Sequence, residues 1–279
     1  MSANPRHHNV NVSGSVYYAL APDGRLFHYA DTPPSGAVET NIEFVEHVVE
    51  ISDVRWSVQA PRLDVEGATL STHRSAVRNF YDADELLRVG YPEVADLVRT
   101  LSGAADVVVF DHNIRRGGAT AKSAWPRGIK PPVSHIHTDF TGKSAVARLA
   151  AVLGAIPSST RRVAAINVWR PLVEPLRDHP LAICDASSVE ERDLLATDLL
   201  YPHRTGEINY LAFNAAHRWC YASDMRTDEV WLFKNFDSAT DGRARFTPHT
   251  AFIDPTYPHV KLSRESVEFR TFAFFPEGA

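Results

Sequence analysis

The feature that most limits the fold of this chain is a series of short apolar runs that fills its second half. Each run has the length of a β-strand, contains β-branched or aromatic residues, and is bounded by Gly, Pro or Asp. Such spacing is typical of a β-sandwich or jelly roll. We therefore predict a mixed α/β fold that is mainly β, with helices flanking the sheets. The predicted strands occupy residues 15–20, 42–51, 105–111, 163–169, 181–184, 210–213, 218–222, 230–236, 243–253 and 266–275.

Clear helical patterns lie between residues 82 and 154. Asp82 followed by Glu85 resembles a capping box, and apolar residues between 94 and 101 mark one helical face that ends near Gly103. Residues 144–154 form a second helical pattern with a glycine C-cap. A chain of 279 residues is long enough to bury one large core. We predict a single domain over residues 1–279, in which residues 1–75 are a less distinct N-terminal extension.

Composition excludes several classes of function. The net charge of −5, from 29 basic and 34 acidic residues without long like-charge runs, gives no footprint for nucleic acid and favours a small-molecule partner. Cys184 and Cys220 lie in apolar runs, so neither a disulfide framework nor a structural zinc site is indicated. No secretory signal and no run of about 18 apolar residues is present, which predicts a reducing, cytoplasmic location without a membrane span.

The most informative motif is SHIHTDF, in which His137 and Asp139 are two residues apart. Side chains two apart on a strand point to one face, so this pair can bind one ion. Two histidines and one carboxylate hold one face of octahedral Fe(II) and leave positions open for a cosubstrate and O2. We predict His249 as the second histidine, because it lies in a predicted strand shortly before the last strand of the chain.

An Arg-x-Ser element, Arg264 and Ser266, opens that last strand. A dicarboxylate cosubstrate needs a fixed cation and a hydroxyl donor for its distal carboxylate, and a guanidinium fits a carboxylate with fork geometry. We therefore assign 2-oxoglutarate binding to Arg264 and Ser266. Arg270 is the rival for this role, because it shares the strand face of Arg264 but lies about 20 Å further along at roughly 3.3 Å per residue.

Several neighbouring residues have two readings each. His135 is either a pocket residue behind the metal ligands or a plain structural histidine. Asn167 and Trp169 share one face of a strand, where Trp169 either walls the active site or fills the core. Arg170, on the other face, either clamps a carboxylate or fixes a loop.

His135 also raises an alternative function, because HxHxD resembles the zinc motif of metallo-hydrolases. A zinc-dependent hydrolase would use His135, His137 and Asp139 to bind an ion with a nucleophilic water. Phe140 stands where that motif needs another histidine, which argues against this reading. His259 is an unsuitable distal ligand, since it lies in a Pro-rich turn close to Arg264.

From about Arg74 to its end, the sequence resembles a known family. The matching segments include VVVFDHNIRR, HTD at 137–139, INVWRPL at 166–172, PLAICD at 180–185, EVWLFKNFDS, FTPHTAF and SRESVEFR. They are similar to the iron/2-oxoglutarate-dependent oxygenase-like group that includes fungal gibberellin desaturase and the small component of the cephamycin methoxylation system.

The resemblance implies a double-stranded β-helix, an HxD…H iron centre, and Fe(II), 2-oxoglutarate and O2 as cofactors. The expected function is hydroxylation or desaturation of a small molecule in secondary metabolism. A non-catalytic subunit that assists a partner oxygenase remains an alternative, as does a homo-oligomer.

Overall fold

The computed structural model describes residues 11–117, 128–154, 160–257, 260 and 262–276. Most of the elements are strands: β1 (Asn11–Leu20), β2 (Leu26–Tyr29), β3 (Glu43–Asp53), β4 (Ala68–Thr72), β5 (Asp106–Arg116), β6 (His137–Thr138), β7 (Arg162–Pro171), β8 (Leu181–Cys184), β9 (Leu194–Tyr201), β10 (Arg204–Leu211), β11 (Trp219–Tyr221), β12 (Glu229–Asp237), β13 (His249–Ala251) and β14 (Glu265–Phe275). The helices are α1 (Ala83–Glu85), α2 (Tyr91–Ser102) and α3 (Gly142–Leu153), with short turns η1 (Val54–Trp56), η2 (Leu86–Gly90), η4 (Ala186–Ser188) and η5 (Glu191–Asp193). No helix in these ranges is long and apolar enough to span a membrane.

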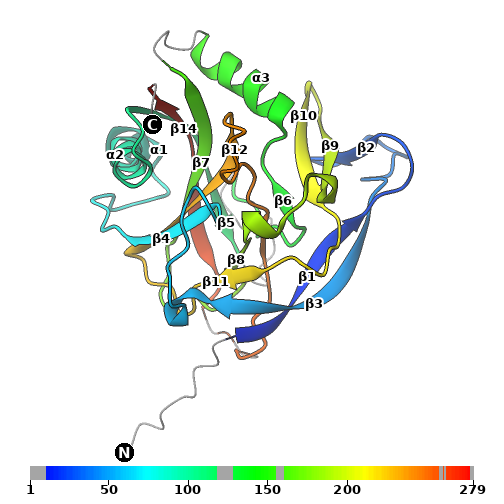
Figure 1. The fold of residues 1–279 in the computed structure, drawn as a ribbon, viewed down its shortest axis with the longest axis horizontal. Helices are drawn as coiled ribbons and strands as arrows, with labels where there is room; N and C mark the ends of the chain where they lie inside the picture. The colour runs from blue at the N-terminus through cyan, green and yellow to red at the C-terminus, as the bar shows by residue number, and fades with distance from the viewer. Residues whose placement is uncertain (1–10, 118–127, 155–159, 258–259, 261, 277–279) are drawn as a thin grey trace, which may run out of the picture.

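The strands form two sheets (Figure 1). Nine strands make the larger sheet in the order β1-β3-β11-β8-β13-β6-β10-β9-β2, and five make the smaller one in the order β4-β12-β7-β14-β5. This curled, mainly β architecture with flanking helices confirms the predicted fold class. The short strands β6 and β13 are neighbours in the larger sheet, and β7 and β14 are neighbours in the smaller one.

Both faces of the smaller sheet are buried, which explains the long apolar runs of its strands. Val168 and Phe269 pack on one face with Val94 and Val98 of α2. Trp169, one residue along from Val168, belongs instead to a cluster with Trp231 and Phe233. Because alternate residues of a strand point to opposite faces, odd-numbered positions of β7 and even-numbered positions of β14 turn away from α2. Those positions carry the polar residues of the candidate site.

The two long helices follow the sequence prediction closely. Gly103 ends α2 in the left-handed region with φ 76°, and its N–H donates to the Arg99 carbonyl. Thr141 caps α3, which ends before Gly154. The predicted capping box at Asp82 is only half formed. Asp82 accepts hydrogen bonds from the first turn, but the carboxylate of Glu85 accepts from the backbone N–H groups of residues 78 and 79.

Two strand predictions in the second half were wrong in extent. Strand β9, with the sequence LLATDLLY, was missed, because its clustered leucines do not alternate with polar residues. The predicted strand 243–253 shrinks to β13. Before it, Arg245 donates to the Asp237 carbonyl at the end of β12, and Arg243 pairs with Asp64 and Asp241. The strand predicted at 210–213 is the end of the longer β10.

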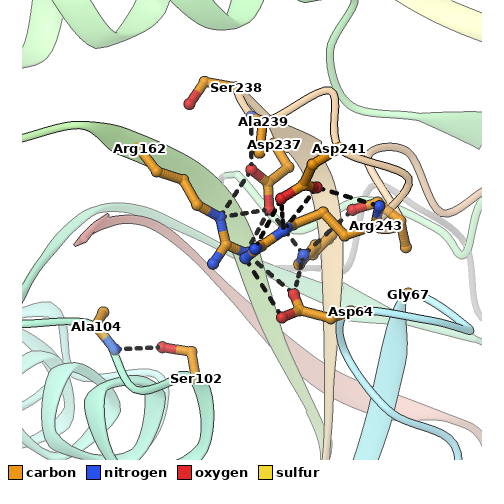
Figure 2. A network of polar contacts seen from close by, with 12 residues as sticks. Asp64, Gly67, Ser102, Ala104, Arg162, Asp237, Ser238, Ala239, Asp241 and Arg243 are labelled. Carbon is orange, nitrogen blue, oxygen red and sulfur yellow. Dashed lines mark hydrogen bonds and ion pairs between the residues drawn. The ribbon is translucent and has the colours of Figure 1, made fainter. Parts of the chain in front are cut away.

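A buried ionic cluster joins the start of β7 to the end of β12 (Figure 2). Asp237 is fully buried and accepts from Arg162 Nη2 at 2.6 Å and from Lys234 Nζ at 2.7 Å. Asp64, from the long loop before β4, accepts from Arg162 at 3.0 Å and also pairs with Lys234 and Arg243. Every charge in this cluster meets an opposite charge, so the cluster fastens the loop to the smaller sheet.

Candidate metal centre

Two histidines face each other across neighbouring strands of the larger sheet. His137 on β6 and His249 on β13 are register partners, and their ring centroids lie 4.5 Å apart. Asp139 follows directly after β6, two residues beyond His137. One ligand atom from each of these three residues lies within 4.8 Å of the other two. The chain therefore brings together the three residues that the sequence predicted as metal ligands.

Backbone carbonyls fix the orientation of both imidazole rings. His137 Nδ1 lies 2.9 Å from the His135 carbonyl oxygen, and His249 Nδ1 lies 3.1 Å from the Thr247 carbonyl oxygen. A carbonyl can only accept, so each Nδ1 carries the proton and each Nε2 keeps a free lone pair. Burial lowers the pKa of His137 to about 4 and also lowers the pKa of His249. Both rings are thus neutral near pH 7, which is the form that binds a metal.

The Asp139 carboxylate is held by the opposite sheet. Its Oδ2 accepts from Asn167 Nδ2 of β7 at 2.8 Å and from Arg270 Nε of β14 at 2.9 Å. Its Oδ1 lies 3.8 Å from His137 Nε2. Burial acts to raise the pKa of Asp139, but the charges of Arg270 and the histidines outweigh it and hold the pKa well below its usual range. The carboxylate is therefore ionised, with one oxygen fixed and the other free toward the histidines.

This donor set fits Fe(II). Two neutral imidazole nitrogens and one carboxylate oxygen converge from one side, and their hydrogen-bonded partners are the kind that orient metal ligands in proteins. The buried Asn235 side chain adds to this support, because its Oδ1 accepts from the Asp139 backbone N–H at 2.8 Å.

A small cavity of about 20 Å³ lies on one side of the three residues. Its lining includes His137, His249 and Trp169, and Arg264 is also part of it. Arg264 is almost fully buried. Its Nη1 donates to the His179 carbonyl at 2.6 Å, its Nε donates to Ser266 Oγ at 3.1 Å, and its guanidinium lies over the Trp169 ring. Burial lowers the pKa of Arg264 to about 9, and it remains a cation at neutral pH.

A large pocket of about 680 Å³ adjoins the small cavity and shares Arg115, Val133 and His137 with it. This volume falls within the usual range for small-molecule sites. His135 lines the pocket and stacks on Phe44 at 3.7 Å between ring centroids. Burial and the nearby His28 and His137 lower the pKa of His135 to about 4, so its ring is a neutral hydrogen-bonding group near pH 7. The lining of the large pocket also includes Leu199, Tyr201, Ile208, Tyr210 and residues 131–133.

The remaining predicted residues fall into two groups. Asn167 and Trp169 share one strand face, as expected, and both lie at the centre: Asn167 on Asp139, Trp169 on the small cavity. Arg270 pairs with Asp139, and with Asp111 and Glu268 at 3.4 and 3.5 Å. Arg170 points to the opposite face and donates to the His73 carbonyl at 2.5 Å, so it fixes a loop.

Sequence reasoning missed two residues that line the small cavity, Arg115 and Glu268. The alternation of polar residues in HNIRR and in SVEFR was the available signal, because it places every second side chain on one face. His259 lies outside the described residues. Within them, His135 is not part of the group of converging ligand atoms, so the ligand set needed for the zinc hydrolase is not assembled.

A jelly-roll sandwich with two histidines and an aspartate between its sheets defines the class of non-haem metal oxygenases with a double-stranded β-helix. Comparison with known proteins agrees. Residues 16–274 match the family described as "Oxidoreductase/YMDC permease-like domain". The hydroxylase/desaturase efuI of Hormonema carpetanum is 30% identical over 85% of this chain and 87% of its own length. The Fe(II)/2-oxoglutarate-dependent dioxygenase nvfI of Aspergillus novofumigatus is 30% identical over 88% of this chain and 90% of its own.

Solved structures lead to the same group. The iron and alpha-ketoglutarate-dependent endoperoxidase NvfI superposes with a TM-score of 0.85 at 26% identity, covering 96% of this chain and 99% of that one. The chain therefore belongs to the family of fungal Fe(II)/2-oxoglutarate-dependent hydroxylases, desaturases and dioxygenases. This membership confirms the expected enzyme class and the expected cofactors, Fe(II) and 2-oxoglutarate.

Proposed function

We propose that this enzyme hydroxylates or desaturates a small molecule of secondary metabolism, with iron bound by His137, Asp139 and His249. The observation that carries the proposal is that each of the three residues has one ligand atom fixed by the protein and another left free toward a common point. Bound iron, with 2-oxoglutarate and O2, supplies the oxidising power needed to break an unactivated C–H bond.

The two cavities divide the remaining work. Arg264, with the hydroxyl of Ser266 beside it, provides the buried cation for the distal carboxylate of 2-oxoglutarate in the small cavity. The large pocket holds the substrate, and the neutral His135 ring in its wall offers a hydrogen bond. Arg270 and Asn167 keep Asp139 ionised and oriented. Trp169 closes the small cavity.

Several finer features of the proposal rest on resemblance alone. The sequence segments shared with gibberellin desaturase and with the cephamycin methoxylation component suggest oxidative tailoring. From chain length and composition we further propose a single domain over residues 1–279 that acts in the cytoplasm. A homo-oligomer or a partner oxygenase subunit is compatible with that group. The relative named endoperoxidase adds peroxide formation to the possible outcomes at the substrate.

The test is anaerobic addition of Fe(II) and then 2-oxoglutarate to the purified protein. We expect one iron per chain and the weak visible charge-transfer band of the 2-oxoglutarate chelate. Succinate should form when O2 is admitted. A protein that shows no band and no succinate, but hydrolyses esters or lactams with Zn(II), would contradict the proposal. His203→Ala, at an exposed histidine, is the matched control for each histidine variant.

A further inference from the structure

Arg115 occupies a special position between the two cavities. It lies on β5 as the register partner of Ser266 on β14, and paired residues of neighbouring strands point to the same face. Its side chain therefore turns toward the metal centre. Arg115 lines both the small cavity and the large pocket, and it is the one cationic side chain that the two linings share among the described residues.

The charge of Arg115 is not neutralised by the part of the chain that the structure describes. Its guanidinium donates to the Pro131 carbonyl at 2.9 Å and forms no ion pair there. The other cations of the large pocket differ. Arg270 has three carboxylate partners, and Lys130 Nζ lies 3.6 Å from Asp31. Arg115 is half-buried, and this burial lowers its pKa.

Arg115 and Arg264 border the same small cavity as two like charges. Arg115 is the largest charge effect that lowers the pKa of Arg264, after burial itself. Glu268 is the one carboxylate in the cavity lining, within the described residues, and it is also drawn toward Arg270. Two buried cations side by side cost stability unless an anion lies between them. Glu268 balances only part of this charge, so the cavity lining keeps an excess of positive charge that favours an anionic ligand.

The two arginines lie at different depths. Arg264 is at the end formed by Trp169 and the His179 carbonyl. Arg115 lines the small cavity together with His137 and His249, so its side chain borders the part of the cavity next to the two imidazole rings. A ligand that reaches from the histidines to Arg264 therefore passes Arg115 near its metal end.

We infer that Arg115 is a second cosubstrate-binding arginine, which contacts the 2-oxo-acid end of 2-oxoglutarate while Arg264 binds the distal carboxylate. The inference rests on the proposed function. It adds a residue and a division of labour: each carboxylate of the dianion meets its own guanidinium. Because Arg115 also lines the large pocket, the bound 2-oxo acid shares one wall residue with the substrate.

The first experiment measures the Kd of 2-oxoglutarate for the Fe(II)-loaded protein under argon, by calorimetry and by the chelate band. Arg115→Gln keeps a donor for the Pro131 carbonyl but removes the charge. We expect its Kd to rise roughly 30-fold or more, the lower end of what losing one partner of a buried charge pair costs. Arg115→Lys should fall between Arg115→Gln and the wild type. Arg116→Gln is the matched control, because Arg116 pairs with Glu265 at the surface and should leave the Kd unchanged.

The second experiment asks which end of the ligand Arg115 contacts, using 2-oxobutyrate, which lacks the distal carboxylate. Arg264→Gln should weaken the binding of 2-oxoglutarate and leave the binding of 2-oxobutyrate unchanged. Arg115→Gln should instead raise the Kd of both ligands by a similar factor. A merely structural role for Arg115 would not give this pattern. Iron content and melting temperature show whether each variant is folded. Arg115→Met is a second uncharged variant, and its Kd values for both ligands should change as those of Arg115→Gln do.

The outcomes distinguish failure of the proposed function from failure of the inference about Arg115. If the wild type binds no 2-oxoglutarate, the proposed function fails. If the wild type binds it and both uncharged variants bind within threefold of the wild type, the inference about Arg115 is wrong. If Arg115→Gln weakens only 2-oxoglutarate, Arg115 belongs with Arg264 at the distal end, which overturns its placement.

Discussion

Strand β7 contributes to two clusters of buried charge that have opposite character. Arg162, at its start, belongs to the cluster with Asp64, Lys234 and Asp237, in which every charged group meets an opposite one (Figure 2). Asn167, five residues along and on the opposite face, belongs to the metal centre, where ligand atoms are left unpaired. Complete pairing indicates a structural role, whereas incomplete pairing inside a well-built shell indicates a site for a ligand.

This contrast predicts that damage to the two clusters separates into two phenotypes. Changes at the metal centre should remove activity and leave stability largely intact, because the free ligand atoms contribute little to the folded apoprotein. Changes at the paired cluster should remove stability and leave the chemistry intact. The experiments below run from the largest expected effect to the smallest.

The largest effect should come from removing a metal ligand. Asp139→Ala or His249→Ala should abolish turnover, with a loss well beyond the roughly 100-fold that loss of an outer partner costs. Iron stoichiometry and succinate production measure the effect. The melting temperature of the His249→Ala apoprotein should change little, whereas Asp139→Ala also removes an acceptor of Arg270 and Asn167 and should lower it. Near-normal iron and succinate in both variants would remove these residues from the metal site.

The next effect tests the paired cluster. Asp237→Ala leaves Arg162 and Lys234 with too few anions, and breaking a buried pair in this way costs about 3–5 kcal/mol. Urea unfolding should show this loss, while succinate formed per folded molecule stays normal. Asp241→Ala is the control, because Asp241 is exposed and its pair with Arg243 should contribute little to stability. Equal costs for the two variants would contradict the contrast.

A third prediction separates the roles of Arg264, which directly precedes β14, and Arg270, which lies within it. Arg264→Ala should weaken 2-oxoglutarate binding by roughly 2 to 5 kcal/mol and leave iron binding nearly unchanged. Arg264→Lys should recover only part of the loss, since lysine lacks the fork. Arg270→Ala should instead weaken iron binding, because Arg270 orients Asp139. A larger rise in cosubstrate KM for Arg270→Ala, with Arg264→Ala nearly silent, would transfer the cosubstrate role to Arg270.

A fourth prediction concerns Asn167, which bonds the fixed oxygen of Asp139. Asn167→Ala should lower metal affinity or activity by about 10- to 100-fold, the usual cost of losing such a partner. Asn41→Ala is the control, because Asn41 lies far from Asn167 in the sequence and its side chain bonds only backbone groups. An unchanged iron Kd in Asn167→Ala would show that Arg270 alone holds the carboxylate.

The smallest effect should come from His135. His135→Phe keeps the stack on Phe44, so the variant should still bind one iron per chain and decarboxylate 2-oxoglutarate. The folded pKa of about 4 lies below the unfolded value of about 6.5, so the unfolded state takes up the proton first as the pH falls. Stability of the apoprotein should therefore decrease from pH 6.5 toward 4, and less so in His135→Phe. Urea unfolding midpoints measured across this pH range test the prediction. An identical pH dependence of the midpoint in the wild type and in His135→Phe would contradict it.

How much of the candidate site and of the fold could be predicted from the sequence depends on how far apart the interacting residues lie along the chain. His137 and Asp139 are two residues apart, so strand geometry alone brings them together. His249 and Arg264 lie far along the chain, and they were predicted from their position near the last strand and from the groups that a metal and a dicarboxylate need. Arg115 stayed hidden, because its position opposite Ser266 follows from the pairing of β5 with β14, which local pattern cannot specify. Strand β9 was missed because its sequence lacks the alternation of a half-buried strand, whereas α2 and α3 carry their own caps and periodicity.

The direct pairing of His137 with His249 also bears on when the enzyme acquires its metal. More than a hundred residues separate the two histidines, and they meet only once β6 and β13 lie side by side in the finished sheet. Contacts of such long range form slowly. A nascent chain that has not yet been synthesised as far as residue 249 cannot hold iron at this site, so metal loading should follow folding and not guide it. Iron uptake during refolding would then time the completion of the larger sheet.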